Sequence, residues 1–356
     1  MDGRLVRTRL AAAVALAMAG VVLVAGPLGA QRAATMGAQV GVLDAAVTAA
    51  ADLPRLYSLL VHWRGEMILE RYYNGRQASR LANVKSVSKS VVSALVGVAI
   101  GRGLIAGVDQ PISAFFADLL ESDEDTRKRE ITVEDLLTMR SGLETTSNRN
   151  YGAWVQSRDW VQFALRQPLS SPPGARMEYS TGNSHLLSAI LTNVSGADTW
   201  QFAQEALGTP LGMSLAKWPQ DPQGIYFGGN DMLLTPRQMV TFGRLYLNAG
   251  RFAGRQIVPA DWVDASLVPR ARSRFSRQQY GYGWWIRTLA GHRAFYAWGF
   301  GGQYIYVVPD LDLVVVSTSS VSADSQRRGH RRTVDEIVEE LIVEPIARLA
   351  TGKPPA

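Results

Sequence analysis

The sequence predicts an α+β fold, with one antiparallel sheet built from both chain ends and a helical lobe inserted between them. Short strand-like runs occur near both ends of the chain, whereas the middle has mostly helical patterns. Strands and helices do not alternate along the chain, which disfavours a parallel sheet. We therefore expect one domain over residues 55–350. Its sheet lobe is expected at about 55–85 and 225–350, and its helical lobe at about 86–224.

The composition excludes several classes of protein before any motif is considered. The chain has 356 residues, 47% of them hydrophobic and 19% charged, which is enough apolar material for a sizeable core. Cysteine is absent, so a disulfide framework and a thiolate metal site are both excluded. The four histidines show no metal-ligand spacing, and we expect neither a metal nor a cofactor.

The net charge of +6 comes from an excess of arginine, which clusters at the N-terminus, at 270–277 and at 327–332. These clusters fall in expected loops and ends, not on one basic face with interleaved aromatic residues. Solvated surface is the main expectation for them, and nucleic acid is not an expected partner. Contact with an anionic membrane is the remaining alternative.

The N-terminus has the pattern of an export signal. Arg4, Arg7 and Arg9 precede an unbroken run of apolar or small residues, Leu10–Val24, and Leu28-Gly29-Ala30 offers a cleavage site. We expect residues 1–30 to be a signal peptide and the protein to be exported, either periplasmic or secreted. The alternative is an uncleaved anchor that associates with the membrane through residues 10–28. Residues 31–54 are expected to be a linker or a first helix.

The individual elements follow from local patterns. The apolar runs Ser58–Trp63 and Glu66–Tyr73, joined at Arg64-Gly65, predict a β-hairpin. Residues 86–105 predict a helix that is apolar nearly all round, and such a helix is normally central. Further helices are expected at Val133–Met139, Asn183–Ser195, Arg237–Asn248 and Thr333–Leu349, and strands at Tyr280–Arg287, Arg293–Trp298, Gln303–Val308 and Leu313–Thr318.

One motif offers a nucleophile. The chain has no G-x-S-x-G, but Ser86 and Lys89 form S-x-x-K at the start of the apolar helix. Residues i and i+3 share a helix face, so the amine can reach the hydroxyl. The backbone N–H of a serine at a helix start is also available to an oxyanion. A second match, Ser214 with Lys217, lies in an expected loop, and we interpret it as chance.

A lysine must lose its proton before it can act as a base. Its ordinary pKa is about 10.4, and burial lowers it. Lys89 lies on a helix otherwise rich in valine, so burial is expected. Tyr179, just before the second apolar helix, could share the task, with a phenolate beside an ammonium as the base for the serine hydroxyl.

Several segments together resemble the motifs of the class C β-lactamase and penicillin-binding serine hydrolase superfamily. They run in the family's order from about residue 55 to 345, which makes the resemblance far more specific than S-x-x-K alone. It implies a β-lactamase/transpeptidase-like fold. The segments are Lys85–Ser90, Ile131–Leu143, Pro172–Ser180, Gly228–Gly243 and Trp298–Gln303.

Two departures bear on the substrate. Thr181 stands where class C β-lactamases have the asparagine of Tyr-x-Asn, and Ala297-Trp298-Gly299 replaces their Lys-Thr-Gly. The third motif therefore has no cation to pair with the carboxylate of a β-lactam or a D-Ala-D-Ala end. The pattern is closer to 6-aminohexanoate-dimer hydrolases and family VIII carboxylesterases.

The resemblance assigns roles to particular residues. Ser86 is the acylated nucleophile, Lys89 and Tyr179 form the base network, and the backbone N–H groups of Ser86 and Phe300 form the oxyanion hole. Which of Lys89 and Tyr179 is the base stays open. The third-motif glycines allow close approach to the substrate. The expected substrate-binding residues are Trp298, Gly299, Gly301 and Tyr151, although Trp298 could equally be strand packing and Tyr151 a surface aromatic.

These observations predict an exported, cofactor-free serine hydrolase that cleaves a small ester or amide through an acyl-enzyme. A penicillin-interactive β-lactamase or D-alanyl-D-alanine carboxypeptidase is the alternative within the enzymes. A non-catalytic, membrane-anchored binding or sensor module is the alternative outside them. The sequence leaves the natural substrate and the oligomeric state open.

Overall fold

The structure is a computed structural model that describes residues 41–324 and 326–351. The expected signal peptide or membrane anchor at 1–30, including its apolar run, lies outside these residues. Of the expected linker or first helix at 31–54, the described part contains helix α2, Asp44–Ala51. None of the helices that the structure describes has the length and apolar composition needed to span a bilayer.

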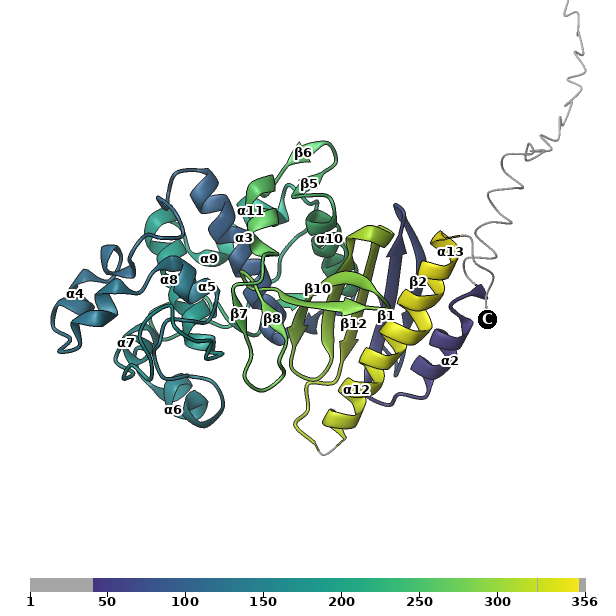
Figure 1. Ribbon diagram of the computed structural model, residues 1–356, viewed down its shortest axis with the longest axis horizontal. Coiled ribbons are helices and arrows are strands. Elements are labelled where there is room, and N and C mark those ends of the chain that lie inside the picture. Colours follow the sequence, from purple (N-terminus) through teal and green to yellow (C-terminus); the bar gives the residue numbers. More distant parts are fainter. Residues whose placement is uncertain (1–40, 325, 352–356) are drawn as a thin grey trace, which may run out of the picture. The chain divides into compact units, whose positions relative to one another are not determined.

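One antiparallel sheet carries both ends of the domain (Figure 1). Its strands in the described chain follow the order β2-β1-β12-β11-β10-β9-β8-β7. Strand β1 pairs with β2, the next strand, and with β12, the last strand, so distant parts of the sequence meet within the sheet. The bounds are β1 Leu56–Trp63, β2 Glu66–Tyr72, β7 Ala271–Arg272, β8 Gln279–Tyr280, β9 Trp285–Leu289, β10 His292–Gly299, β11 Gln303–Val308 and β12 Leu313–Ser319.

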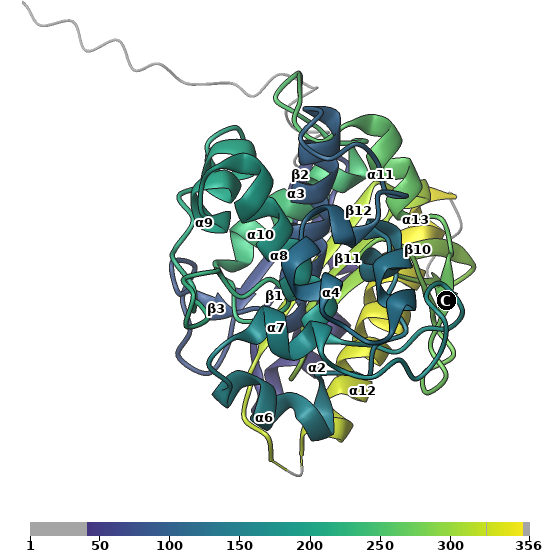
Figure 2. The ribbon, with the colours of Figure 1, turned by 90° about the vertical axis from the view of Figure 1, so that its left-hand side faces the viewer.

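The regular structure between β2 and β7 is mostly helical, and helices α3 and α8 contact each other there (Figure 2). The helices before residue 210 are α3 Ser88–Gly101, α4 Ala117–Glu121, α5 Val133–Leu137, α6 Tyr151–Gln156, α7 Trp160–Leu165, α8 Thr181–Ser195 and α9 Thr199–Ala203, with short turns η1 Lys85–Val87, η2 Ile112–Ala114, η3 Thr126–Glu130, η4 Asn148–Asn150 and η5 Gln204–Gly208.

The remaining elements cover or extend the sheet. Two short two-stranded ribbons lie outside it, β3 with β4 and β5 with β6. These elements are β3 Ala82–Asn83, β4 Leu233–Leu234, α10 Pro236–Leu247, β5 Arg251–Phe252, β6 Arg255–Gln256, α11 Ala260–Ser266, η6 Pro309–Leu311, α12 Arg327–Val338, η7 Glu339–Val343 and α13 Glu344–Ala350.

Two apolar cores lie on opposite faces of the sheet. Because side chains alternate along a strand, Val314 and Val316 of β12 enter one core, while Leu313 and Val315 enter the other. The first core joins the sheet to α3, α8 and α10, and the second joins it to α2, α12 and α13. The predicted central helix is confirmed, because twelve of the fourteen residues of α3 are buried.

The structure corrects three expected boundaries. The strand expected at Tyr280–Arg287 is two strands, because the chain turns at Gly281–Gly283. A Cβ at Gly281 would lie 2.0 Å from the Ser266 carbonyl oxygen, so the chain passes α11 too closely for a regular strand. The terminal helix begins at Arg327, six residues before the expected start at Thr333, and it contains the π-turn η7. Finally, α3 begins at Ser88 and ends at Gly101, so it is shorter than the helix expected at 86–105.

Gly97→Ala should destabilise the fold, because it brings a methyl group against the core. A Cβ at position 97 would lie 2.3 Å from the Trp262 ring. Overpacking of this kind costs about 1–3 kcal/mol of unfolding free energy, to be measured by urea denaturation. Gly152→Ala is the matched control, because that helical position has nothing within 4 Å, and the change should stabilise by about 0.5–1 kcal/mol. Equal effects of both changes would contradict the tight packing of α3 on α11.

Candidate active site

Ser86 lies in a short turn between β3 and α3 that a polar cluster holds in place. Lys85, the preceding residue, has a φ of +51°, which is strained for a residue with a side chain. Its ammonium forms an ion pair of 2.7 Å with Asp231, and its N–H donates to the Asn83 side chain at 3.0 Å. Asn83 also donates to Asp231 at 2.9 Å. These contacts offset the strain and fix the direction of Ser86, whose side chain is half-buried.

Lys89 points at Ser86 from the first turn of α3. Its Nζ lies 3.2 Å from the Ser86 Oγ and 3.5 Å from the Thr181 Oγ1, and it donates to the Gly229 carbonyl oxygen. The residue is only 3% exposed. Burial lowers the pKa of Lys89 to about 7, although the negative charge of Asp231 opposes this shift. A large fraction of the amine is therefore neutral at neutral pH.

Tyr179 lies beside the same amine, at the start of the segment that leads into α8. Its ring centroid is 5.0 Å from the Lys89 Nζ, and its carbonyl oxygen accepts from the Thr145 hydroxyl at 2.8 Å. Burial raises the pKa of Tyr179 above its ordinary value, and a hydrogen bond with Ser86 opposes the rise only in part. Burial therefore favours the uncharged form of both groups over a phenolate beside an ammonium.

Aromatic rings extend from Tyr179 along the sheet. Tyr179 stacks on Trp285 of β9 with ring centroids 5.7 Å apart, and Trp285 meets the edge of Trp298 of β10 at 6.2 Å. The guanidinium of Arg331 lies 5.4 Å from the Trp298 ring. Trp298, which was expected either to pack or to line the pocket, is half-buried and belongs to this row. We call Tyr179, Trp285 and Trp298 the aromatic row.

The third-motif turn lies against the turn that carries Ser86. A Cβ at Gly299 would lie 2.1 Å from the Val84 carbonyl oxygen, so only glycine allows this approach. Gly301 has a φ of +92°, and a Cβ there would lie 2.4 Å from the Ser320 carbonyl oxygen. Close packing against neighbouring carbonyl oxygens therefore explains why both positions are glycine. They set the path of the chain on both sides of Phe300.

Tyr151 reaches the same region from the start of α6. Its hydroxyl accepts a hydrogen bond of 3.2 Å from Asn230, which lies between Gly229 and Asp231. Burial raises the pKa of Tyr151, so its hydroxyl keeps its proton. The side chain is half-buried. Tyr151 is therefore tied to the segment that holds Lys89, and it is not a detached surface aromatic.

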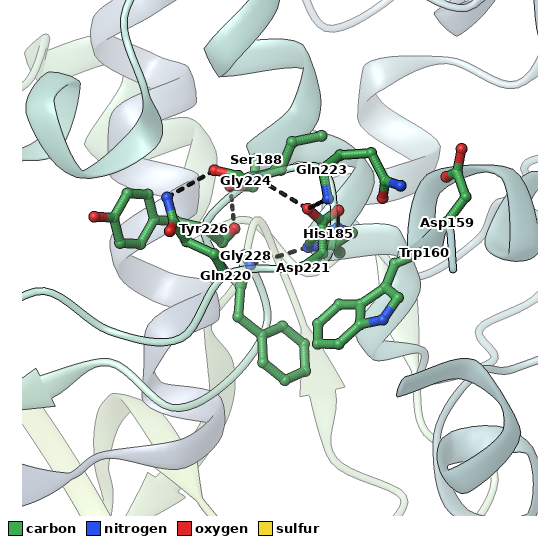
Figure 3. A network of polar contacts seen from close by, with 12 residues as sticks. Asp159, Trp160, His185, Ser188, Gln220, Asp221, Gln223, Gly224, Tyr226 and Gly228 are labelled. Carbon is green, nitrogen blue, oxygen red and sulfur yellow. Dashed lines mark hydrogen bonds and ion pairs between the residues drawn. The ribbon is translucent and has the colours of Figure 1, made fainter. Parts of the chain in front are cut away.

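A buried network behind the site holds the segment that ends at Gly229 (Figure 3). The Nε2 of His185, on α8, lies 2.9 Å from a carboxylate oxygen of Asp221. The other oxygen of Asp221 accepts two backbone N–H groups of its own turn, at 2.9 and 2.8 Å. The Gly228 N–H donates to the His185 Nδ1 at 3.5 Å. His185 is structural, and it stabilises the backbone next to the acceptor of Lys89.

Sequence reasoning missed three contributors to the site: Gly229, Asp231 and Trp285. Gly228-Gly229-Asn230 was part of the resemblance, but nothing in it indicated that the Gly229 carbonyl contacts Lys89. The sequence singled out neither Asp231 nor Trp285 as a site residue. Each contributor depends on a contact between residues far apart in the sequence, which no local pattern records. The second S-x-x-K differs, because Lys217 lies 4.7 Å from the Trp200 ring and no hydrogen bond in the described chain joins it to Ser214.

Comparison with known proteins decides the family. A family model described as Beta-lactamase matches residues 57–339. The chain belongs to this family. Its members are serine hydrolases that act on amide and ester bonds. The resemblance and the β-lactamase/transpeptidase-like fold expected from the motifs are thereby confirmed.

Individual relatives are distant but cover most of the chain. The 6-aminohexanoate-dimer hydrolase of Paenarthrobacter ureafaciens is 27% identical over 297 residues, which span 75% of this chain and 73% of the relative. A Bacillus anthracis structure, provisionally assigned as a 6-aminohexanoate-dimer hydrolase, has a TM-score of 0.71 at 21% identity and covers 85% of this chain and 81% of its own. EstCE1, described as a hydrolase with promiscuous acyltransferase activity, has a TM-score of 0.67 at 16% identity, with 87% and 100% covered.

Asp221→Ala should strongly destabilise the protein, because it leaves His185 and two backbone N–H groups without their buried acceptor. Breaking a buried pair of this kind costs about 3–5 kcal/mol. Glu205→Ala is the control, because it breaks an exposed pair with Arg102 and should cost about 0–1 kcal/mol. Both values come from urea denaturation. A small loss for Asp221→Ala would show that the network does not hold this segment.

Proposed function

We propose that the protein hydrolyses an ester or amide bond through an acyl-enzyme on Ser86. The observation that carries the proposal is the buried amine of Lys89, 3.2 Å from the Ser86 Oγ and with its pKa lowered to about 7. A serine hydroxyl is a weak nucleophile until a neighbouring base takes its proton. A neutral amine at hydrogen-bonding distance supplies that base.

Lys89 is the base in this proposal and Tyr179 carries the proton onward. Burial lowers the pKa of Lys89 but raises that of Tyr179, so the neutral amine is far more accessible at neutral pH than the phenolate. The Lys89 amine takes the Ser86 proton as the Oγ attacks the carbonyl carbon. The phenol of Tyr179, through its hydrogen bond with Ser86, lies where it can donate a proton to the leaving alcohol or amine and recover one from Lys89.

The oxyanion of the tetrahedral intermediate is proposed to bind the backbone N–H groups of Ser86 and Phe300. The close approach of Gly299 to Val84 supports this pairing, because it brings the residue before Phe300 against the turn that carries Ser86. Collapse of the intermediate releases the alcohol or amine and leaves the acyl group on Ser86. A water molecule, activated by Lys89, then attacks the acyl carbon and releases the carboxylic acid.

The substrate class follows from what lines the site. The aromatic row favours a substrate with an apolar segment next to its scissile bond, because flat rings bury such a segment well. Ala297 stands where a β-lactamase or carboxypeptidase would place a cation, which disfavours penicillin chemistry. One relative is named for hydrolysis of the 6-aminohexanoate dimer, and we propose a small linear ester or amide for this chain. Export by residues 1–30 is part of the proposal.

Ser86→Ala should abolish turnover of short-chain p-nitrophenyl esters, with a loss of at least about a thousand-fold in kcat. Ser214→Ala, in the other S-x-x-K, should leave kcat unchanged. Intact mass during turnover should show an acyl adduct on the wild type and none on Ser86→Ala.

Other results of this assay would contradict the proposal in specific ways. Activity that survives Ser86→Ala would remove Ser86 as the nucleophile. An adduct without turnover would favour the sensor module, and turnover of nitrocefin in place of simple esters would favour a β-lactamase.

The pH dependence of kcat/KM should follow Lys89. Below its pKa the amine is an ammonium that cannot accept the Ser86 proton, so kcat/KM should rise with pH to a plateau, with a midpoint at about 7. Asp231→Asn removes the negative charge that raises this pKa, so the midpoint should move to lower pH. Glu205→Gln, at the exposed pair, should not move it. A midpoint near 10 would contradict a neutral amine as the base.

A further inference from the structure

The hairpin between β7 and β8 projects an apolar side chain into water. Strands β7 and β8 form the edge of the sheet, with Ala271 opposite Tyr280 and Arg272 opposite Gln279. Residues 273–278 form the tip. Phe275, at its centre, is 100% exposed, more than any other large hydrophobic side chain of the described residues. A single exposed apolar side chain is common on protein surfaces, so Phe275 indicates a partner only together with the charges next to it.

The tip is an ordered turn, so its own hydrogen bonds present Phe275 to solvent. The Ser273 hydroxyl accepts from the Phe275 N–H at 3.3 Å and from the Ser276 N–H at 3.2 Å. The Arg277 N–H donates to the Ser273 carbonyl oxygen at 3.0 Å, and the Ser273 N–H donates to that of Gln278 at 3.0 Å. The backbone of the tip is thus closed by its own hydrogen bonds, with the Phe275 side chain in solvent.

Three arginines lie within three sequence positions of Phe275. Arg272, Arg274 and Arg277 are all exposed, and none of them forms an ion pair with any residue that the structure describes. No aspartate or glutamate occurs between residues 265 and 309. The nearby Arg270 differs, because it forms an ion pair of 2.8 Å with Glu134 and thereby fixes the base of the hairpin. The tip is therefore a single aromatic ring within a cluster of three uncompensated positive charges.

We propose that this hairpin tip, together with Arg272 of β7, docks the protein on a lipid bilayer that carries anionic headgroups. The guanidinium groups would bind lipid phosphates, while the Phe275 ring enters the boundary between headgroups and acyl chains. Either contribution alone is weak, and the two together give binding that is both salt-dependent and dependent on the ring. A soluble polyanion would satisfy the arginines but would leave the ring in water.

Docking by this hairpin would place the membrane next to the candidate active site. Tyr280 of β8 packs edge-on against Tyr179, with ring centroids 6.3 Å apart. The strand that carries the docking tip therefore also contacts the site. The proposal does not depend on hydrolysis by Ser86, because it concerns only the surface of the β7–β8 hairpin.

A fluorescent label on the tip tests the proposal directly. Cysteine is absent from the chain, so Ser276→Cys gives one attachment point beside an intact Phe275. The full-length protein, labelled there with a polarity-sensitive dye, is mixed with phosphatidylcholine vesicles with or without 30% phosphatidylglycerol. The dye emission should shift to the blue only with the anionic vesicles, and high salt should reverse the shift. Arg255→Cys labels the β5–β6 hairpin as a matched control and should show no shift.

Two sets of substitutions in the labelled protein separate the ring from the charges. Phe275→Ser should weaken binding to the anionic vesicles by about ten-fold or more, from the lost burial of the ring. Replacing Arg272, Arg274 and Arg277 by Gln should weaken it by about five-fold per arginine. Arg251→Gln with Arg255→Gln, on the control hairpin, should change nothing. Residues 1–40 are the same in every variant, so membrane binding by that segment cannot produce these differences.

Several outcomes would overturn the proposal. A shift of equal size with neutral vesicles would remove the role of the charges. A response unaffected by Phe275→Ser would remove the role of the ring. A shift of the dye emission with soluble dextran sulfate, and none with vesicles, would show that the three arginines bind a polyanion and not a membrane.

Discussion

The burial of one amine is the constraint on which the rest of the candidate site depends. Lys89 is buried where α3 meets Tyr179, Thr181 and the Gly229 carbonyl, and this burial lowers its pKa into the neutral range. The negative charge of Asp231 opposes this shift of the Lys89 pKa, but the effect of burial is larger. The ion pair of Asp231 with Lys85 fixes the turn of Ser86. One acidic side chain therefore helps to position the nucleophile without reprotonating the base.

The fold brings this arrangement together from distant parts of the chain. Central α3 carries Lys89, the segment before α8 brings Tyr179, and the loop held by His185 and Asp221 supplies the Gly229 carbonyl. The sheet contributes its β10 end, where Gly299 lets the chain reach the carbonyl of Val84. The pairing of β1 with β12 completes the sheet by joining the two ends of the domain. Packing on both faces then leaves little freedom for the turns that meet at Ser86.

The sequence predicted the parts of the site that depend on local spacing. Ser86 and Lys89 lie one helical turn apart, so their contact followed from the motif. The aromatic row and the Gly229 acceptor depend on which strands and loops become neighbours, and no local pattern carried that information. The sequence left open which of Lys89 and Tyr179 is the base, because their charge states depend on burial that only the fold reveals. The terminal helix was placed too late because its first turn is rich in arginine and lacks an apolar pattern.

The most direct test of this account is the protonation state of Lys89 itself. The chain has only five lysines, so lysine labelled with ¹³C at the ε carbon gives few NMR resonances, and Lys89→Arg identifies the one of interest. The account predicts that this resonance titrates with a midpoint at about pH 7 in the folded protein. A resonance that stays in its charged position up to about pH 10, as for an ordinary lysine, would contradict it. Lys89 could then not serve as the neutral base for Ser86.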